Sequence, residues 1–241
     1  MKRTIVFTAL LLAAAPLLAA DSGGKDDVIA AAKKLAASDN YTWHTTVEST
    51  NNGRFRPGPT DGKTEKDGFT FVTFSMGDNT SEAALKGTNG AVKTDGDWQS
   101  LADAAKDDGG GGFNPTRFLA MRMQNFKSPA QEAGDLANGA ADLKLADGVY
   151  AGDLTEAAAK DRLTFFRRPP GGGDGPEVSG AKGSVKFTVS DGVLSKYVLN
   201  VQGHVEFNGN GRDVNNTTTC EIKDIGKTKV EVPDDAKKKI Q

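Results

Sequence analysis

Residues 184–207 read SVKFTVSDGVLSKYVLNVQGHVEF, and their alternation indicates the fold class. Apolar and polar side chains alternate on both sides of Asp191-Gly192, a dipeptide that favours the two-residue turn of a β-hairpin. A second turn at 208–211 (NGNG) leads into a third alternating stretch at 218–223. We therefore predict three consecutive antiparallel strands with one apolar face and one polar face.

The N-terminal half contains further strand patterns. Residues 40–50 alternate around Tyr41 and Trp43, which is typical of a half-buried strand. Residues 69–76 (FTFVTFSM) carry apolar side chains at both parities, so we expect this strand to be covered on both faces. The stretch 51–68 is rich in Gly, Pro, Asp and Lys and is predicted to be one long connection.

A helix with several large apolar side chains is predicted in the middle of the chain. Asn114 and Pro115 are residue types preferred at the N-cap and at the first position of a helix. Phe118, Met121 and Phe126 follow at spacings that place them on one wide face. With shorter helices expected near both ends of the mature chain, the domain combines helices with strands.

Residues 1–20 have the features of an export signal. A Lys-Arg pair precedes an apolar run over 5–18, and small residues follow that run. We therefore expect this segment to be removed and residues 21–241 to form a single domain, located in the periplasm or secreted. Position 21 is Asp rather than the Cys that takes a lipid in bacterial lipoproteins, so a soluble exported protein is favoured over an anchored one.

The charge balance argues against one large class of function. The chain has 30 Lys and Arg against 32 Asp and Glu, and loss of the signal removes two basic residues, which leaves a net charge of −4. Nucleic-acid binders gain affinity by neutralising phosphates with an excess of Lys and Arg, so we expect no nucleic-acid partner. After the signal no second long apolar run remains, so we do not expect an integral membrane protein.

The chain shows no motif for a known reaction. Its two histidines, His44 and His204, lie at the polar parity of predicted strands, and Cys220 lies at an inward parity, as a small core side chain would. The Gly-x-Ser-x-Gly elbow of serine hydrolases is absent. We therefore predict no metal site and no cofactor, and no enzymatic activity unless either histidine meets a carboxylate in a cleft.

Four short motifs follow one another in the C-terminal part of the chain. They are GVYAGDL at 148–154, the strand at 183–190, DGVL at 191–194 and DIGKTKVEVP at 224–233. In this order they resemble the LolA-like family of periplasmic lipoprotein carriers and the related mycobacterial lipid-carrying lipoproteins. The resemblance implies an α+β fold in which helices cover the open side of a curved antiparallel sheet, an incomplete β-barrel. It also implies an apolar hollow that takes acyl chains.

We therefore predict a carrier or binding protein for a lipid or for the acyl chains of a lipoprotein. Its partner would be a hydrophobic small molecule or acyl chain, with an envelope protein as a further candidate. A curved sheet with one apolar face, under amphipathic helices, can leave a dry concavity of this kind. The alternative is a structural or protein-interaction module of the cell envelope, in which the same sheet is filled by its own side chains. The residues expected to line a cavity are Trp43, Phe69, Phe71, Phe74, Phe118, Met121 and Phe126.

Overall fold

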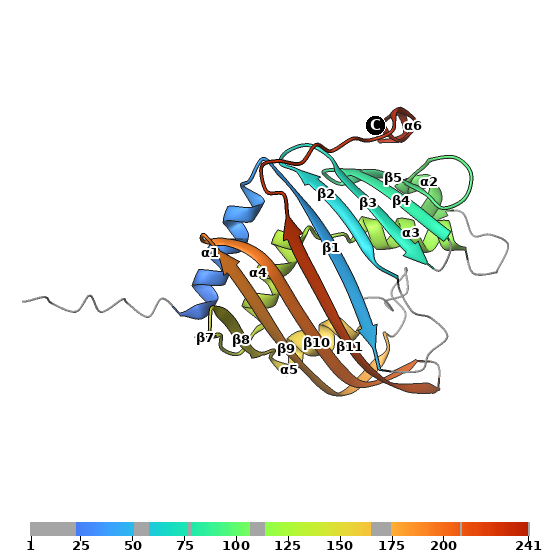
Figure 1. The fold of residues 1–241 in the computed structure, drawn as a ribbon. Helices are drawn as coiled ribbons and strands as arrows, with labels where there is room; N and C mark the ends of the chain where they lie inside the picture. Colours follow the sequence, from blue (N-terminus) through green and yellow to red (C-terminus); the bar gives the residue numbers. More distant parts are fainter. Residues whose placement is uncertain are drawn as a thin grey trace, which may run out of the picture.

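The fold is one large, curved antiparallel sheet with helices on its concave side (Figure 1). The computed structural model describes residues 23–50, 58–76, 79–106, 114–164, 175–207 and 209–240. In these ranges eleven strands follow the order β6-β5-β4-β3-β2-β1-β11-β10-β9-β8-β7, and the sheet does not close into a barrel. The predicted fold class, a half-barrel with helices over its open side, is confirmed. The predicted export signal lies outside the described residues.

The elements follow one another as short strands, then helices, then long strands. The strands are β1 (Asn40–Ser49), β2 (Thr60–Glu65), β3 (Thr70–Met76), β4 (Asn79–Lys86), β5 (Asn89–Lys93), β6 (Gln99–Ser100), β7 (Lys144–Ala146), β8 (Val149–Asp153), β9 (Glu177–Ser190), β10 (Val193–Phe207) and β11 (Asn210–Lys223). The helices are α1 (Gly24–Ala36), α2 (Leu101–Lys106), α3 (Pro115–Gln124), α4 (Pro129–Gly139), α5 (Glu156–Thr164) and α6 (Asp234–Lys239).

The three-strand meander predicted from the alternation is β9, β10 and β11. The turn between β9 and β10 has positive φ at Asp191 (53°) and Gly192 (71°), as the predicted two-residue hairpin requires. The last strand, β11, also pairs with the first, so that Trp43 lies opposite Ile222 and Thr45 lies opposite Cys220. This long-range pairing joins the N-terminal and C-terminal halves into one sheet.

One prediction about this half of the sheet was wrong. The stretch 51–68, predicted to be a connection, contains β2, which pairs with both β1 and β3. Its sequence, TDGKTE, has no apolar side chain to reveal a strand, and its place is set by the backbone hydrogen bonds of its two neighbours. Gly62 is needed there because a Cβ would overlap the indole ring of Trp43, which lies across it.

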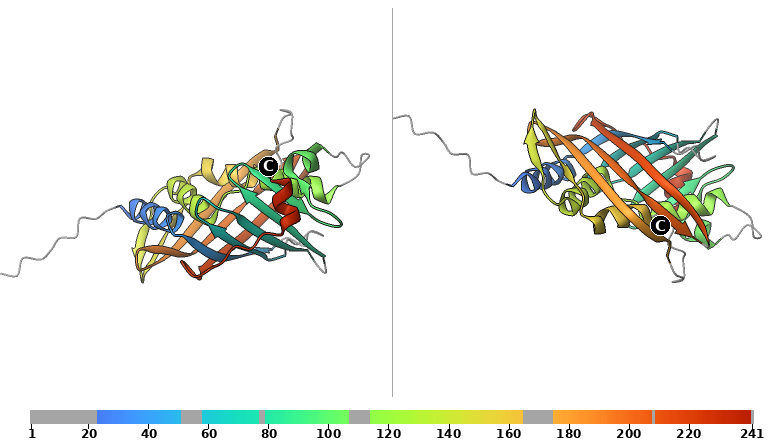
Figure 2. Two further views of the ribbon diagram at one scale, coloured as in Figure 1. Left: turned by 90° about the horizontal axis from the view of Figure 1, so that it is seen from above. Right: turned by 90° about the horizontal axis from the view of Figure 1, so that it is seen from below.

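The helices divide unequally between the two faces of the sheet. On the concave side, α1, α4 and α5 cover the β9–β10 end, and α2 and α3 cover the β5 end (Figure 2). The main core lies beneath them and includes Leu35, Leu136, Phe187 and Tyr197, which are nearly inaccessible to solvent. The short helix α6 lies on the opposite, convex face against β5 and β6.

The strand β3 is covered on both faces, as its sequence predicts. Val72 and Phe74 point into the main core, whereas Phe71 packs into a second, small core on the convex face. That core also contains Trp98 and Val232, the latter from the C-terminal tail. Among the described residues, no helix combines the length and the apolar character needed to cross a membrane.

Candidate ligand-binding site

The middle of the concave face is the part that the described helices cover least. The inner side chains of β9 and β10 are buried beneath α1, α4 and α5, whereas Thr45 and Val47 of β1 are only half-buried. The same holds for Val214 and Thr218 of β11, which share this face. Hydroxyl groups and small apolar groups therefore alternate along a partly accessible inner strip.

An aromatic pair covers the adjoining part of this strip. The connection between α3 and α4 crosses the concave face, and its Phe126 stacks on Trp43 with ring centroids 6.0 Å apart and an interplanar angle of 25°. The Trp43 indole also donates a hydrogen bond from Nε1 to Thr64 Oγ1 (3.2 Å). The tryptophan is thus fixed to the sheet, while Phe126 belongs to a short connecting segment.

Local sequence signals position both helices that flank this segment. The Asn114 side chain accepts a hydrogen bond from the backbone N–H of Arg117 and caps α3, as predicted. Ser128 and Gln131 form a reciprocal capping box at the start of α4, with Pro129 at the first helical position. The capping box at Ser128 thus fixes where the Phe126 segment ends, whereas the Asn114 cap fixes the far end of α3.

A small groove lies between α3 and the inner face of β2, β3 and β4. Its volume is about 40 Å³, and its walls include Phe74 and Phe118. The guanidinium of Arg122 lies 4.8 Å from the centroid of the Phe74 ring, a cation–π arrangement. Burial lowers the pKa of Arg122, and the negative charge of Glu132 offsets part of that effect.

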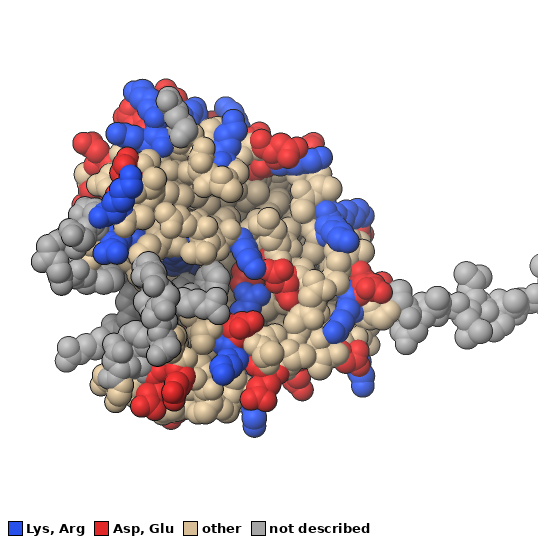
Figure 3. Space-filling model, turned by 180° about the vertical axis from the view of Figure 1, so that it is seen from behind, with Lys and Arg blue, Asp and Glu red and all other residues tan. Residues whose placement is uncertain are grey.

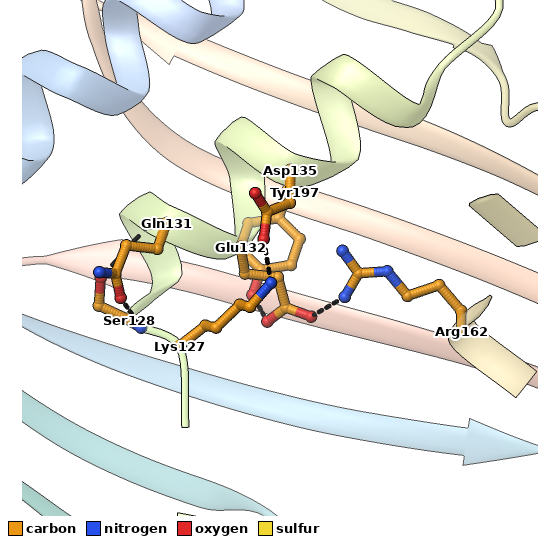
Figure 4. Close-up of polar contacts among 7 residues, drawn as sticks. All are labelled: Lys127, Ser128, Gln131, Glu132, Asp135, Arg162 and Tyr197. Atoms are coloured by element: carbon orange, nitrogen blue, oxygen red, sulfur yellow. Dashed lines mark hydrogen bonds and ion pairs between the residues drawn. The ribbon is translucent and has the colours of Figure 1, made fainter. Parts of the chain in front are cut away.

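A polar cluster fastens α4 and α5 to the sheet (Figure 4). One Glu132 oxygen accepts a hydrogen bond from Tyr197 Oη (2.7 Å), and the other lies 3.1 Å from Arg162 Nη1. Burial raises the pKa of Tyr197 well above its usual value, and the Glu132 carboxylate adds to the effect. Glu132 therefore joins one strand and two helices through a single carboxylate.

The structure brings five of the seven predicted lining residues to the helix side of the sheet, in two places. Trp43 stacks with Phe126, and Phe74 lines the groove with Phe118. Met121 lies half-buried on α3, the same helix as Phe118.

The other two predicted lining residues lie elsewhere. Phe69 and Phe71 face the convex side, where Phe69 lies under the Lys86 ammonium and Phe71 contacts Trp98. Because successive side chains of a strand point to opposite faces, these two cannot share one cavity with Phe74.

The sequence pattern missed the charged residues of the site. Arg122, Glu132, Arg162 and Tyr197 come from three helices and one strand, and no motif links them in the sequence. One signal was available, because Phe118, Arg122 and Phe126 are four residues apart and such positions share a helix face. An arginine on an otherwise aromatic stripe is a candidate for a function.

Two hollows border the described residues, and neither is an enclosed apolar cavity of the size usual for ligand pockets, about 300 to 1,000 Å³. The larger has about 270 Å³, lies open beside the end of α5 and is lined by Lys160, Asp161, Thr164, Gly175 and Pro176. The smaller is the groove at Arg122.

Both histidines meet a carboxylate, although not in a cleft. His44 Nδ1 lies 2.7 Å from Asp61 Oδ1, and His204 Nδ1 lies 2.7 Å from Asp213 Oδ1. Each pair joins directly opposed residues of neighbouring strands on the exposed convex face. The described part of the chain also holds no group of three or more His, Cys, Asp or Glu arranged for a metal ion.

The helix side of the molecule carries both signs of charge. Seen from behind, Lys and Arg side chains are interspersed with Asp and Glu, and no large patch of one sign is visible (Figure 3). Long-range attraction to a polyanion therefore gains little from this face.

Neither a protein-family model nor a curated protein matches the chain. Among solved structures it is similar to the Mycobacterium tuberculosis lipoprotein LppX, with 10% identity, a TM-score of 0.43, and 87% of this chain and 98% of that chain covered. LprF from Mycobacterium bovis has 12% identity and a TM-score of 0.42, with 88% of this chain and 97% of that chain covered. A DUF1329 family protein from Desulfovibrio piger has 11% identity and a TM-score of 0.33, with 83% of this chain and 90% of that chain covered.

These likenesses are distant, and the strand order defines the fold without them. The molecule is an open antiparallel half-barrel with a helix-covered concave face.

Proposed function

We propose that this chain is an exported carrier or binding protein for an apolar ligand, a lipid or the acyl chains of a lipoprotein, and that it performs no covalent chemistry. One observation carries the proposal. Among the described residues, helices cover the two ends of the concave face, while the α3–α4 connection places Phe126 on Trp43 at its middle. A ligand that lifts this connection gains access to the inner strip at Val47 and Thr218.

The energies favour such an exchange. An aromatic pair contributes about 0.5 to 1.5 kcal/mol beyond its buried area, and exposing the Phe126 side chain costs about 2 kcal/mol more. Burying one CH₂ contributes about 0.8 kcal/mol, so a long acyl chain supplies on the order of 10 kcal/mol before ordering costs. On these estimates an acyl chain has enough free energy to replace Phe126 on Trp43.

The two tryptophans provide a built-in test, since they lie on opposite faces of the sheet. Trp98→Phe leaves Trp43 on the concave face, and Trp43→Phe leaves Trp98 on the convex face. A brominated hexadecanol quenches indole fluorescence only at short range. We expect strong quenching in Trp98→Phe and little in its matched control, Trp43→Phe, at the same probe concentration.

A second measurement addresses the natural ligand. Native mass spectrometry of the chain purified from the cells that produce it should detect a bound lipid or acylated peptide. If no such adduct is found and the brominated alcohol quenches neither tryptophan, the carrier function is refuted. Quenching of Trp98 alone would move the binding surface to the convex face and would also refute the proposal.

A second candidate function is a protein-interaction module of the cell envelope, and two observations favour it. The side chains beneath α1, α4 and α5 are packed out of contact with solvent, with Phe187 and Leu194 at 0% exposure. The outer strand β7 also presents Leu145 with 59% of its surface exposed, beside backbone groups that a further strand can pair with. A Leu145→Asp variant that loses an envelope protein partner, while the alkyl probe fails to bind, would favour this module.

A further inference from the structure

The groove at Arg122 is lined differently from the rest of the concave face. Besides Phe74 and Phe118, its walls include the hydroxyl-bearing Thr60, Ser81 and Thr94. Its volume of about 40 Å³ holds roughly two or three water-sized groups. An alkyl chain alone gains nothing from hydroxyls, whereas a small polar head group matches both the size and the lining.

The strand register places this groove at one end of a largely polar row that crosses six of the eleven strands. The row runs from Tyr197 through Cys220, Thr45 and Thr60 to Phe74 and Ser81, each residue lying opposite the next. In the neighbouring row, Trp43 lies between Ile222 and Gly62, and that row continues through Val72 and Ala83 without a polar side chain. The concave face thus has a polar row beside an apolar one.

The two helix groups each place an arginine over the polar row, with different surroundings. At the Tyr197 end, Arg162 lies 3.1 Å from the Glu132 carboxylate, which also accepts a hydrogen bond from Tyr197 (Figure 4). At the Phe74 end, the Arg122 guanidinium lies over the Phe74 ring beside the groove, and the negative charge of Glu132 acts on it from a neighbouring helix. A guanidinium held away from water attracts an anion more strongly than one in solution, and its planar donors match carboxylate and phosphate.

We propose that the groove binds the anionic head of a single-chain amphiphile, with Arg122 as the counter-ion and the hydroxyls of Thr60 and Ser81 as hydrogen-bond partners. This inference rests on the proposed function and specifies its ligand class. The alkyl chain then runs past the end of α3 toward Phe126, in the connection after that helix, and toward the apolar row at Trp43. Head and chain then each meet the row of matching polarity.

The test compares three probes with the same sixteen-carbon chain and different heads. Hexadecanoate, hexadecyl phosphate and hexadecanol are titrated into the full chain at pH 8, the two anions below their critical micelle concentrations and the alcohol below its solubility limit. We expect both anions to bind about ten- to a hundredfold more tightly than the alcohol, the range for charge-assisted hydrogen bonds. Equal affinity for all three refutes the head-group inference and leaves the proposed function intact, whereas binding of none of them refutes both.

Variants of the arginine provide an independent readout. In Arg122→Gln the advantage of the two anions over hexadecanol should disappear, with the alcohol affinity unchanged, and Arg122→Lys should retain part of it. The matched control is Lys186→Gln, which removes one positive charge from the exposed convex face of β9 and should leave all three affinities unchanged. If Lys186→Gln and Arg122→Gln reduced the affinity advantage of the anions equally, the preference would come from net charge, and the proposal would be overturned. The head-group preference of the unmodified chain decides the case if Arg122→Gln fails to fold.

Discussion

The two halves of the sheet are built from the same alternation and differ in what covers their inner faces. In the C-terminal half, β9, β10 and β11 have 14, 15 and 14 residues and bury large side chains beneath helices. In the N-terminal half, β2 to β5 have 5 to 8 residues, and small residues such as Ala83 and Gly90 face the helices. The C-terminal half therefore supplies most of the stability, and the N-terminal half has room for a groove.

The difference shows how one sheet can combine a rigid part with an adaptable part. Large side chains such as Phe187 and Tyr197 fill the first half completely. In the second half, α3 meets a thinner inner surface through Phe118 and Arg122, which border the groove. Binding sites are often found on the less stable elements of a scaffold, and the head-group site that we propose accordingly lies at α3 and not in the C-terminal half.

The largest expected effect is in the C-terminal half. Phe187→Ala removes a fully buried ring from between long strands and should lower the free energy of unfolding by about 3 to 5 kcal/mol. Urea unfolding followed by circular dichroism measures this change in the free energy of unfolding. A loss below about 1 kcal/mol would contradict the assignment of stability to this half.

The polar cluster on α4 should have the next largest effect. Glu132→Ala leaves the Arg162 guanidinium and the Tyr197 hydroxyl without their carboxylate and should cost about 2 to 3 kcal/mol. Glu132→Gln keeps an acceptor and should cost less. The control on the same helix is Asp135→Ala, which breaks the more exposed ion pair with Lys127 and should cost at most about 1 kcal/mol. Equal losses in Glu132→Ala and Asp135→Ala would show that the cluster has no special role.

The buried thiol in the C-terminal half makes stability depend on alkaline pH. Burial raises the pKa of Cys220 from 9.0 to about 11, so the unfolded chain releases this proton at a lower pH than the folded chain. The contribution is complete below pH 9 and is lost as the pH rises toward 11, with a decrease of about 1 kcal/mol between pH 8 and pH 10. Unfolding measured across this range should show a shallower pH dependence in Cys220→Ala. Identical slopes in both proteins would contradict a buried, protonated thiol.

The smallest effect on stability is expected in the groove. Phe118 has 36% of its surface exposed, so Phe118→Ala should lower the free energy of unfolding by less than about 1 kcal/mol. The same variant should weaken hexadecanol binding several-fold, since the ring is a groove wall. A large loss of stability with unchanged binding would reverse the roles of the two halves.

Patterns that are local in sequence predicted the elements well. The alternation around Asp191-Gly192 predicted the β9–β10 hairpin, and the Asn114-Pro115 signal predicted the start of α3. The strand β2 was missed because a strand held by both neighbours needs no apolar side chain of its own. Of the seven residues predicted to line a cavity, five lie on the helix side of the sheet and two on the convex side, and their role in binding stays a prediction.

By itself the sequence determined where strands, turns and helix starts lie, because these depend on the period of apolar residues and on caps within a few positions. The tertiary structure alone decided that β1 pairs with β11 and that Phe71 and Phe74 serve opposite faces. It also decided that Tyr197 meets Glu132, 65 positions away. Contacts of this kind depend on packing between distant elements, for which neighbouring residues carry no signal.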